Sequence, residues 1–248
     1  MAKVTLLTHT VNPDKTIAAA AKLCYSPSSI DNILDGLTDE SASGFVDMLS
    51  EIGHESPIEH ASFTFGIEGV SRSLLAQITR HRIASFSVQS QRYVEEAQFE
   101  YIIPPEIEKN EAAKKLYIEA MEDDQQKYET LTKILKDQHK EKLLKEGKSE
   151  ADAEKTAKKA AIEDARFVLP NSCATKMIVT MNARSLQNFF AHRCCNRAQW
   201  EIREIADRML ELCCEVSPKL FKKSGPKCLF GKCTEGKMTC GSPPKLRN

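Results

Sequence analysis

The sequence predicts an α+β fold, in which a mixed or antiparallel sheet is flanked by helices and carries an inserted, charged helical hairpin. Three observations support this class. Some short stretches alternate apolar and polar residues with period two, which is typical of strands. Others space their apolar residues as helices do. Residues 110–164 are dense in Glu, Asp and Lys, with one glycine and no proline. A chain of 248 residues can bury a substantial core.

The first elements are short. Lys3–Thr8 is predicted to be a strand, and Asn12-Pro13-Asp14 a turn. An Ala-rich helix is expected over Lys15–Cys24. Ser26–Ser43 is rich in Ser, Asp and Gly and is expected to be irregular at its start. Helical spacing over Gly44–Ile52 predicts a helix that stops at the next glycine.

The middle of the chain changes period. From Ala61, Phe63, Phe65 and Ile67 alternate with polar residues and glycine, which predicts a half-buried strand. Ser71–Arg82 is expected to be helical, and residues 83–98 irregular.

Residues 110–164 predict two helices. The apolar residues of the first helix form one narrow stripe, namely Tyr117, Met121, Tyr128, Leu131 and Leu135. Gly147 ends this helix, and Ser149 with Asp152 resembles a capping box for a second helix that closes near Pro170. A solvent-facing hairpin is favoured over a coiled-coil partner surface because the stripe is short.

The C-terminal third predicts a strand at Lys176–Met181, followed by helices at Ala183–Arg193 and Ala198–Val216. Residues 221–248, hereafter the tail, combine Pro, Gly, Lys and Cys and are expected to be loop-rich. The expected organisation is therefore one domain over residues 1–220, with the hairpin 110–164 inserted in it, followed by the tail.

The overall composition excludes several classes of protein. A net charge of +0 and a pI near 7.0 are not those of a polycation for nucleic acid or of an acidic tail. No run approaches the ~18 apolar residues of a membrane span. The N-terminus is too short and polar for a secretory signal. Nine cysteines, an odd number, favour reduced thiols in the cytoplasm over a disulfide scaffold.

The neutral total conceals a segregated charge distribution. No lysine lies between Lys22 and Lys109, whereas the stretch 71–94 holds four arginines and no acidic residue. Its centre is Arg80-His81-Arg82, and the serines at 85, 87 and 90 add hydroxyl donors of the kind that complete a phosphate cradle. An anion-binding site is favoured over a solvated basic loop, or over arginines paired with distant carboxylates such as Glu51 or Glu59.

A second polar cluster follows the last predicted strand. Arg184, Asn188 and His192 lie four residues apart and share one face of their helix. The pattern alone leaves open whether this face lines a site or faces solvent, and solvent is the simpler interpretation.

Both clusters carry a family resemblance. Arg80-His81-Arg82, seven residues and Ser90 resemble the signature of flavin-dependent thymidylate synthases. Four further blocks of that family follow the same order over about residues 1–220: residues 54–60 (HESPIEH), 166–170 (RFVLP), 182–186 (NARSL) and 198–202 (AQWEI). The hairpin matches only as a variable insertion, and the tail lies outside the match.

The resemblance implies an enzyme that makes dTMP from dUMP, with methylenetetrahydrofolate as one-carbon donor and NADPH as reductant through tightly bound FAD. It implies a homotetramer with its sites at subunit junctions, and no membrane or nucleic-acid partner. By similarity, the FAD-binding residues are Ser56, Arg80, His81, Arg82, Asn182, Arg184, Asn188 and His192.

The resemblance also implies a site for dUMP. Its residues are Gln77, Ser90, Arg92, Arg166 and Arg193, with Arg80 from a neighbouring chain. Arg193 and Ser90 are the residues assigned to catalysis. A fixed guanidinium at Arg193 would stabilise negative charge on the uracil ring. Ser90 has no evident base beside it, so its expected role is to bind and orient the nucleotide.

Two positions depart from the family pattern. Ser87 stands where the family often has Asn, and Val88 where it frequently has Glu. Val88 cannot replace a carboxylate, so any contact there must come from the backbone. One flavin or nucleotide contact is therefore in doubt, whereas the family is not.

Other motifs are weaker. His54 and His60 lie six residues apart with a proline between them, which argues against a helical zinc site. The paired cysteines 194–195 and 213–214 are expected to be small packing residues, because the flavin route needs no thiol nucleophile. Cys228, Cys233 and Cys240 in the tail would need a fourth zinc ligand from elsewhere, so no metal site is predicted, and a reduced flexible tail or an occasional disulfide is preferred.

Two rivals to the enzyme remain. One is a nucleic-acid-binding module built on Arg80–Arg92, although that segment has a single aromatic, Phe86, where single-strand binders interleave several. The other is a non-catalytic nucleotide-binding protein, which would follow if Val88 proved disabling.

Overall fold

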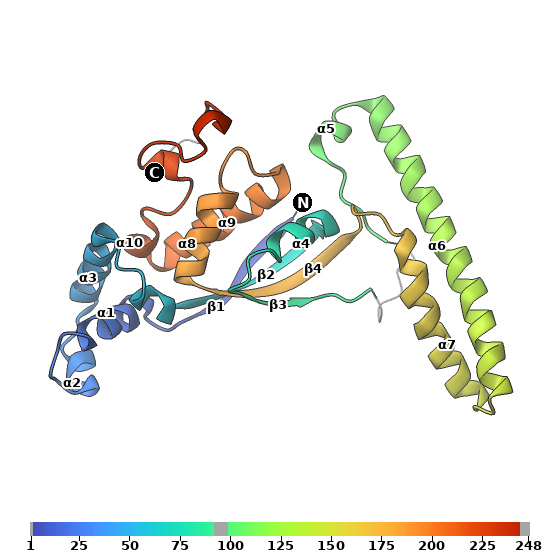
Figure 1. Cartoon of the computed structure of the whole chain (residues 1–248), viewed down its shortest axis with the longest axis horizontal. Coiled ribbons are helices and arrows are strands. Elements are labelled where there is room, and N and C mark those ends of the chain that lie inside the picture. Colours follow the sequence, from blue (N-terminus) through green and yellow to red (C-terminus); the bar gives the residue numbers. More distant parts are fainter. Residues whose placement is uncertain (1, 92–98, 244–248) are drawn as a thin grey trace. The chain divides into compact units, whose positions relative to one another are not determined.

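The computed structural model describes residues 2–91 and 99–243 (Figure 1). Their contacts form two compact units. Unit 1 comprises Met1–Glu68, Ala76–Ser87 and Met177–Asn248, and unit 2 comprises Gly69–Leu75 and Val88–Lys176. None of the helices in the described ranges is both long and apolar enough to cross a membrane.

The sheet is antiparallel and has four strands, which confirms the predicted fold class. The strands are β1 (Lys3–His9), β2 (Ser62–Ser71), β3 (Ser85–Val88) and β4 (Ala174–Asn182), in the order β1-β2-β4-β3. Lys3 lies opposite Glu68, and the β1–β2 register shifts between Leu6 and Thr8.

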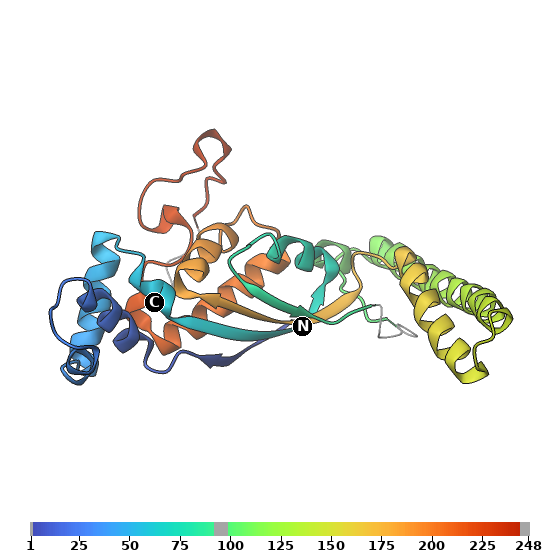
Figure 2. The ribbon, with the colours of Figure 1, turned by 60° about the horizontal axis from the view of Figure 1, so that its bottom comes forward.

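One face of the sheet in unit 1 supports the core. Phe63, Phe65 and Ile67 of β2 are fully buried, as the period-two pattern predicts. The helices α8 (Ala183–Arg193), α9 (Trp200–Val216) and α10 (Pro218–Phe221) follow in the chain, and α8 and α9 lie on the same side of the sheet (Figures 1 and 2). Phe221 meets Phe63 edge to face, with ring centroids 5.4 Å apart. The predicted last two helices are confirmed, although α9 begins two residues later because the Gln199 side chain caps it.

The opposite face of the sheet is open within one chain. Thr64 and Thr180 share a hydrogen bond of 2.9 Å across β2 and β4 on this face. Leu7 and Ile178 lie 51% and 47% exposed.

Residues 26–43 contain more helix than the composition predicts. After α1 (Pro13–Leu23), α2 (Ile30–Asp35) begins at Ser29, whose side chain accepts a hydrogen bond from the Asn32 N–H. α3 (Asp39–Ile52) begins five residues earlier than expected, because Thr38 and Ser41 form a reciprocal capping box. Residues 26–29 are irregular, as predicted, whereas Ser29 and Thr38 mark the starts of two helices that the composition did not indicate.

Two glycines of α3 should respond oppositely to substitution. Gly53 follows the helix at φ 72°, a conformation that disfavours any side chain. Gly44 lies inside the helix, and an added Cβ would meet nothing within 4 Å. We expect Gly53→Ala to lower the free energy of unfolding by about 1 kcal/mol and Gly44→Ala to raise it by about 0.5–1 kcal/mol. Denaturant titration of both variants measures this difference, and equal shifts of one sign would contradict it.

The segment after β2 differs from prediction in two ways. α4 (Arg72–Ile78) ends four residues before the predicted end, so residues 80–82 lie in a loop. Residues 85–88 form strand β3, not an irregular stretch. β3 is only four residues long, too short for its alternation of serines with Phe86 and Val88 to predict a strand, and its place beside β4 comes from backbone pairing.

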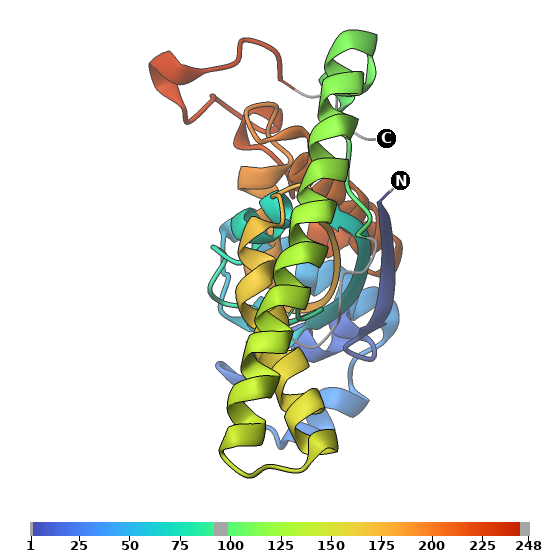
Figure 3. The same ribbon diagram turned by 90° about the vertical axis from the view of Figure 1, so that its right-hand side faces the viewer.

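Unit 2 contains the predicted hairpin. α6 (Glu111–Lys145) and α7 (Glu150–Ala165) pack side by side, after the short α5 (Pro105–Glu108) and before the 3-10 turn η2 (Arg166–Val168) (Figures 1 and 3). Met121 and Tyr128 of the predicted stripe are buried, as are four alanines of α7, namely Ala153, Ala157, Ala161 and Ala165. Lys140 forms ion pairs with Glu150 and Glu154 across the two helices at 3.3 and 3.1 Å.

The tail has little regular structure (Figure 2). It contains two 3-10 turns, η3 (Lys227–Leu229) and η4 (Gly236–Met238). The remaining short element, η1 (Pro57–His60), leads into β2.

Candidate functional site

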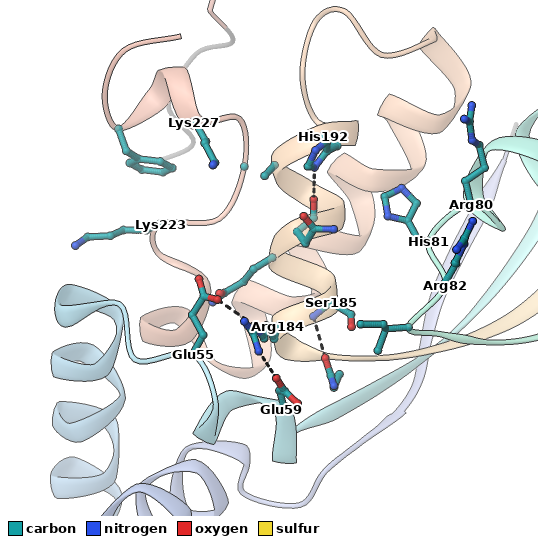
Figure 4. Close-up of a pocket in the computed structure, with 17 residues that line it drawn as sticks. Glu55, Glu59, Arg80, His81, Arg82, Arg184, Ser185, His192, Lys223 and Lys227 are labelled. Atoms are coloured by element: carbon teal, nitrogen blue, oxygen red, sulfur yellow. Dashed lines mark hydrogen bonds and ion pairs between the residues drawn. The ribbon is translucent and has the colours of Figure 1, made fainter. Parts of the chain in front are cut away.

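Unit 1 contains a cavity of about 930 Å³ whose walls come from four separate segments (Figure 4). Glu55 and Glu59 come from the η1 region, residues 80–83 from the loop after α4, and one face of α8 forms a third wall. The tail supplies the fourth. The lining includes Arg80, His81, Arg82, Asn182, Arg184, Asn188, His192, Lys223, Lys227 and Phe230. Both polar clusters singled out in the sequence thus line one cavity.

Arg80 and Arg82 are exposed at this cavity. Within the described residues neither guanidinium has an ion pair or a hydrogen bond. The carboxylates that were the alternative partners are engaged elsewhere, because Glu51 pairs with Lys222 at 3.6 Å and Glu59 pairs with Arg184. Two cations left unneutralised in a cavity favour an anionic ligand.

His81 is held between the loop and α8. Its ring meets Phe189 edge to face at 4.9 Å, and its Nε2 lies 3.0 Å from the Nε of Arg193. A guanidinium only donates, so Nε2 accepts the hydrogen bond and the proton of the neutral ring lies on Nδ1. Arg193 also donates through Nη2 to the carbonyl of Gln77 at 3.3 Å. These contacts leave Nη1 without a partner among the described residues.

Burial, together with the charges of Arg193 and His192, lowers the pKa of His81 to about 4. An unfolded histidine has a pKa near ~6.5. Between these values the unfolded chain binds a proton that the folded chain does not bind.

We therefore expect His81 to lower the free energy of unfolding as the pH falls from about 6.5 to about 4. His81→Gln should lack this part of the pH dependence. Denaturant titrations of both proteins at several pH values measure this. Parallel pH profiles of the two proteins would contradict the prediction.

Arg184 differs from the other cationic residues of the cavity. Its Nε lies 3.1 Å from Glu55, and its Nη1 pairs with Glu59. These two carboxylates raise the pKa of the guanidinium further above its ordinary value. Arg184 therefore differs from the free arginines of the 80–82 loop, and it joins the η1 region to α8.

The other α8 residues line the cavity beside it. Asn182 caps the helix by accepting from the Ser185 N–H at 2.9 Å. His192 Nδ1 lies 2.9 Å from the carbonyl of Asn188. Arg184, Asn188 and His192 are all exposed, as the pattern alone favoured, and they also line the cavity.

Sequence reasoning missed the part of the cavity that comes from the tail. Lys223, Lys227 and Phe230 line the cavity, although the tail lies outside the family resemblance. No local sequence pattern predicts this contact, because it depends on how α9 and α10 place the tail beside α8. The one available signal was a pair of lysines beside a Gly-Pro turn.

Other predicted residues lie outside this lining. Ser56 is exposed, with its hydroxyl 3.2 Å from His54 Nε2. Ser85 and Ser87, expected in a phosphate cradle, lie on β3. Gln77 contributes the carbonyl that Arg193 contacts.

The remaining nucleotide residues belong to unit 2 or are not described. Ser90 is half-buried in unit 2, where Arg166 Nε donates to the Glu163 carbonyl at 3.1 Å. Arg92 lies outside the described residues. Of the positions that depart from the family pattern, Val88 ends β3, half-buried.

Comparison with known proteins decides the family. Residues 5–219 match the family described as "Thymidylate synthase complementing protein". A flavin-dependent thymidylate synthase of Clostridium tetani is 54% identical over 245 residues, which cover 99% of this chain and 95% of that protein. The chain belongs to the flavin-dependent thymidylate synthase family.

Further flavin-dependent thymidylate synthases match over most of their length. The protein of Geobacter sulfurreducens is 42% identical over 247 residues, covering 99% of this chain and 96% of its own. That of Pyrococcus furiosus is 37% identical over 244 residues, covering 95% and 90%. Membership of the flavin-dependent thymidylate synthase family makes the chain an enzyme of thymidylate synthesis, which confirms the predicted class and excludes the non-catalytic rivals.

Proposed function

We propose that the enzyme converts dUMP to dTMP, with methylenetetrahydrofolate as the one-carbon donor, NADPH as the reductant and FAD as the bound flavin. The observation that carries this proposal is the cavity itself. Arg80, Arg82, Lys223 and Lys227 line it and form no ion pair within the described residues, while both of its carboxylates are bound to Arg184. A ligand with a pyrophosphate or a phosphomonoester supplies the missing negative charge.

The cavity fits FAD by charge and by size. Its volume of about 930 Å³ is at the upper end of the ~300–1,000 Å³ of ligand sites. Arg80 and Arg82 would neutralise phosphates by bidentate contacts, and the Nδ1–H of His81 would donate a hydrogen bond. Asn182, Asn188, Arg184 and His192 supply further polar groups. When bound, the flavin supplies the redox chemistry, which protein side chains cannot supply.

Arg193 is the residue best placed to polarise a uracil ring. Its contacts with His81 and the Gln77 carbonyl fix the guanidinium, so little reorganisation accompanies the reaction. Burial and the charge of Arg80 lower its pKa, so the guanidinium is less stable than in water and gains from a nearby anion. In this proposal Gln77, Ser90, Arg92 and Arg166 complete the dUMP site, and Ser90 orients the nucleotide.

The proposal includes a homotetramer with its sites at subunit junctions. The open sheet face with Leu7 and Ile178 supports an assembly of several chains. Since Arg80 is exposed, it is available to a nucleotide bound by a neighbouring chain as well as to its own cavity.

One preparation tests the function. The purified protein should be yellow, and heat denaturation should release FAD rather than FMN, identified by chromatography. With dUMP, methylenetetrahydrofolate and NADPH it should form dTMP, and omission of any one should stop formation. Colourless protein that FAD cannot reconstitute, or dTMP formation without methylenetetrahydrofolate, would overturn the proposal.

A further inference from the structure

A second cavity of unit 1 is surrounded by thiols. Cys195, just beyond α8, and the three tail cysteines Cys228, Cys233 and Cys240 all line a cavity of about 250 Å³. All four are free thiols. The lining of this cavity includes no residue of the two clusters that the family resemblance explains, and the tail lies beyond residue 219, where the family match ends.

The four sulfurs are electrostatic neighbours. Cys195, Cys228, Cys233 and Cys240 line the same cavity, so their four thiolates would repel one another. A divalent cation placed among them removes this repulsion, because it stabilises every thiolate at once.

The tail is fastened to the segment that carries Cys195. The Arg197 guanidinium donates to the carbonyl of Met238, and the Asn196 amide donates to that of Ser242. The Ser242 N–H in turn donates to Cys240 Sγ at 3.4 Å. The Cys240 thiol also donates to the Ser242 carbonyl at 3.3 Å, so Cys240 lies within the part of the tail that is fastened to residues 196 and 197.

Apolar packing does not explain how this part of the tail keeps its fold. From residue 227 to residue 243 every described residue is exposed or half-buried. Phe230 and Met238 are 46% and 61% exposed. Segments without a core of their own usually depend on disulfides or a structural metal.

We propose that Cys195, Cys228, Cys233 and Cys240 bind one Zn²⁺ ion, which fastens the tail to the end of α8. Four thiolates form a common closed, structural zinc site, and soft sulfur ligands favour zinc over the oxygen-preferring cations. Arg197 and Glu235 line the same cavity and pair with each other at 3.8 Å, so together they add no net charge beside the four thiols.

Zinc binding requires the four sulfurs to move closer together. Among the described residues, no group of three or more His, Cys, Asp or Glu side chains lies close enough together to hold a metal ion. The backbone around the thiols permits the movement, because Gly231 and Gly241 flank Cys233 and Cys240 and both glycines are exposed.

The zinc site has a consequence for the larger cavity. Lys227 and Phe230, on either side of Cys228, line the cavity proposed for FAD. Fixing Cys228 therefore fixes one wall of that cavity. This consequence rests on the proposed function, whereas zinc binding itself does not.

Metal analysis of untagged protein, purified without chelators from zinc-supplemented cells, tests the site. We expect one zinc per chain. Cobalt substituted for zinc should show the charge-transfer and visible bands of tetrahedral thiolate coordination. Cys195→Ser and Cys240→Ser should each lose at least 90% of the zinc (~tenfold, 1.4 kcal/mol or more). The control is Cys24→Ser, which changes the exposed cysteine at the C-cap of α1, distant in sequence from the four proposed ligands. This variant should keep its zinc.

Limited trypsin digestion gives a second measurement. Zinc should protect the bonds after Lys227, Lys232 and Lys237, and a chelator should expose them. The site would be overturned if wild-type protein contained no zinc, or if it contained iron and sulfide instead of zinc. Zinc retained by both site variants, or disulfides among these four cysteines, would also overturn it.

Flavin content separates the two proposals. Site variants that lose zinc and also lose flavin support the link between the tail and the larger cavity. Variants that lose zinc but keep flavin overturn that link alone. Zinc-loaded wild-type protein that binds no FAD would overturn the proposed function and leave the zinc site supported.

Discussion

Arg193→Ala is expected to lower dTMP formation by about 100-fold to 1,000-fold while the enzyme keeps its flavin. The side chain is absent from the lining of the large cavity, yet it is fixed beside it by His81 and the Gln77 carbonyl. Its loss removes a positioned positive charge without removing Arg80 or Arg82. Turnover under saturating dUMP, with flavin absorbance recorded on the same sample, measures both quantities.

Two variants serve as controls: one removes an arginine elsewhere in the chain, and the other keeps a positive charge at position 193. Arg208→Ala removes an exposed guanidinium of α9 that pairs with Glu211 at 2.9 Å, and it should leave turnover unchanged. Arg193→Lys keeps the charge but cannot reproduce the two-point contact, so it should recover only part of the activity. Normal turnover by Arg193→Ala would show that the assignment of this residue is wrong.

The second large effect is expected on FAD binding, when either unpaired arginine of the loop is removed. Arg80→Ala and Arg82→Ala are each expected to weaken FAD binding by about 10-fold to 100-fold, because each removes charge-assisted hydrogen bonds worth about 1.5–3 kcal/mol. Neither guanidinium supports the fold through an ion pair within the described residues. The free energy of unfolding of the flavin-free protein should therefore change little.

Titration of flavin-free protein with FAD measures these affinities, and denaturant titration of the same samples measures stability. Arg208→Ala again serves as control. A double variant that binds FAD as tightly as wild type would contradict the anion-site interpretation. A large loss of stability in the flavin-free variants would show instead that these arginines serve the fold.

The sequence predicted the elements whose signal is local. The period-two run at Phe63, Phe65 and Ile67 marks a strand with one buried face, and one stripe of apolar residues defines the α6–α7 hairpin. In contrast, β3 is a strand because β4 offers it a backbone edge, and α2 is a helix because Ser29 caps it. Such long-range pairing and short capped turns leave little trace in periodicity.

The candidate site was predictable to a similar extent. The absence of acidic residues around Arg80 and Arg82 correctly indicated unneutralised charge. Arg184 resembled them in the sequence, but its partners Glu55 and Glu59 lie more than 120 positions away along the chain. The tail is the clearest omission, because only the tertiary fold brings Lys223 and Lys227 to the cavity.

The clamp of Arg184 by two carboxylates gives the large cavity a polarity. Arg80 and Arg82 on the loop and the two tail lysines carry positive charge, whereas Arg184 faces two carboxylates, which leaves its wall of the cavity with a net negative charge. The anionic end of a ligand therefore gains electrostatic energy beside the free cations and loses it beside Arg184 and its two carboxylates. Inhibitors built on this cavity should follow the same rule: an acidic group belongs at the Arg80–Arg82 end, and a neutral hydrogen-bonding group belongs beside Arg184.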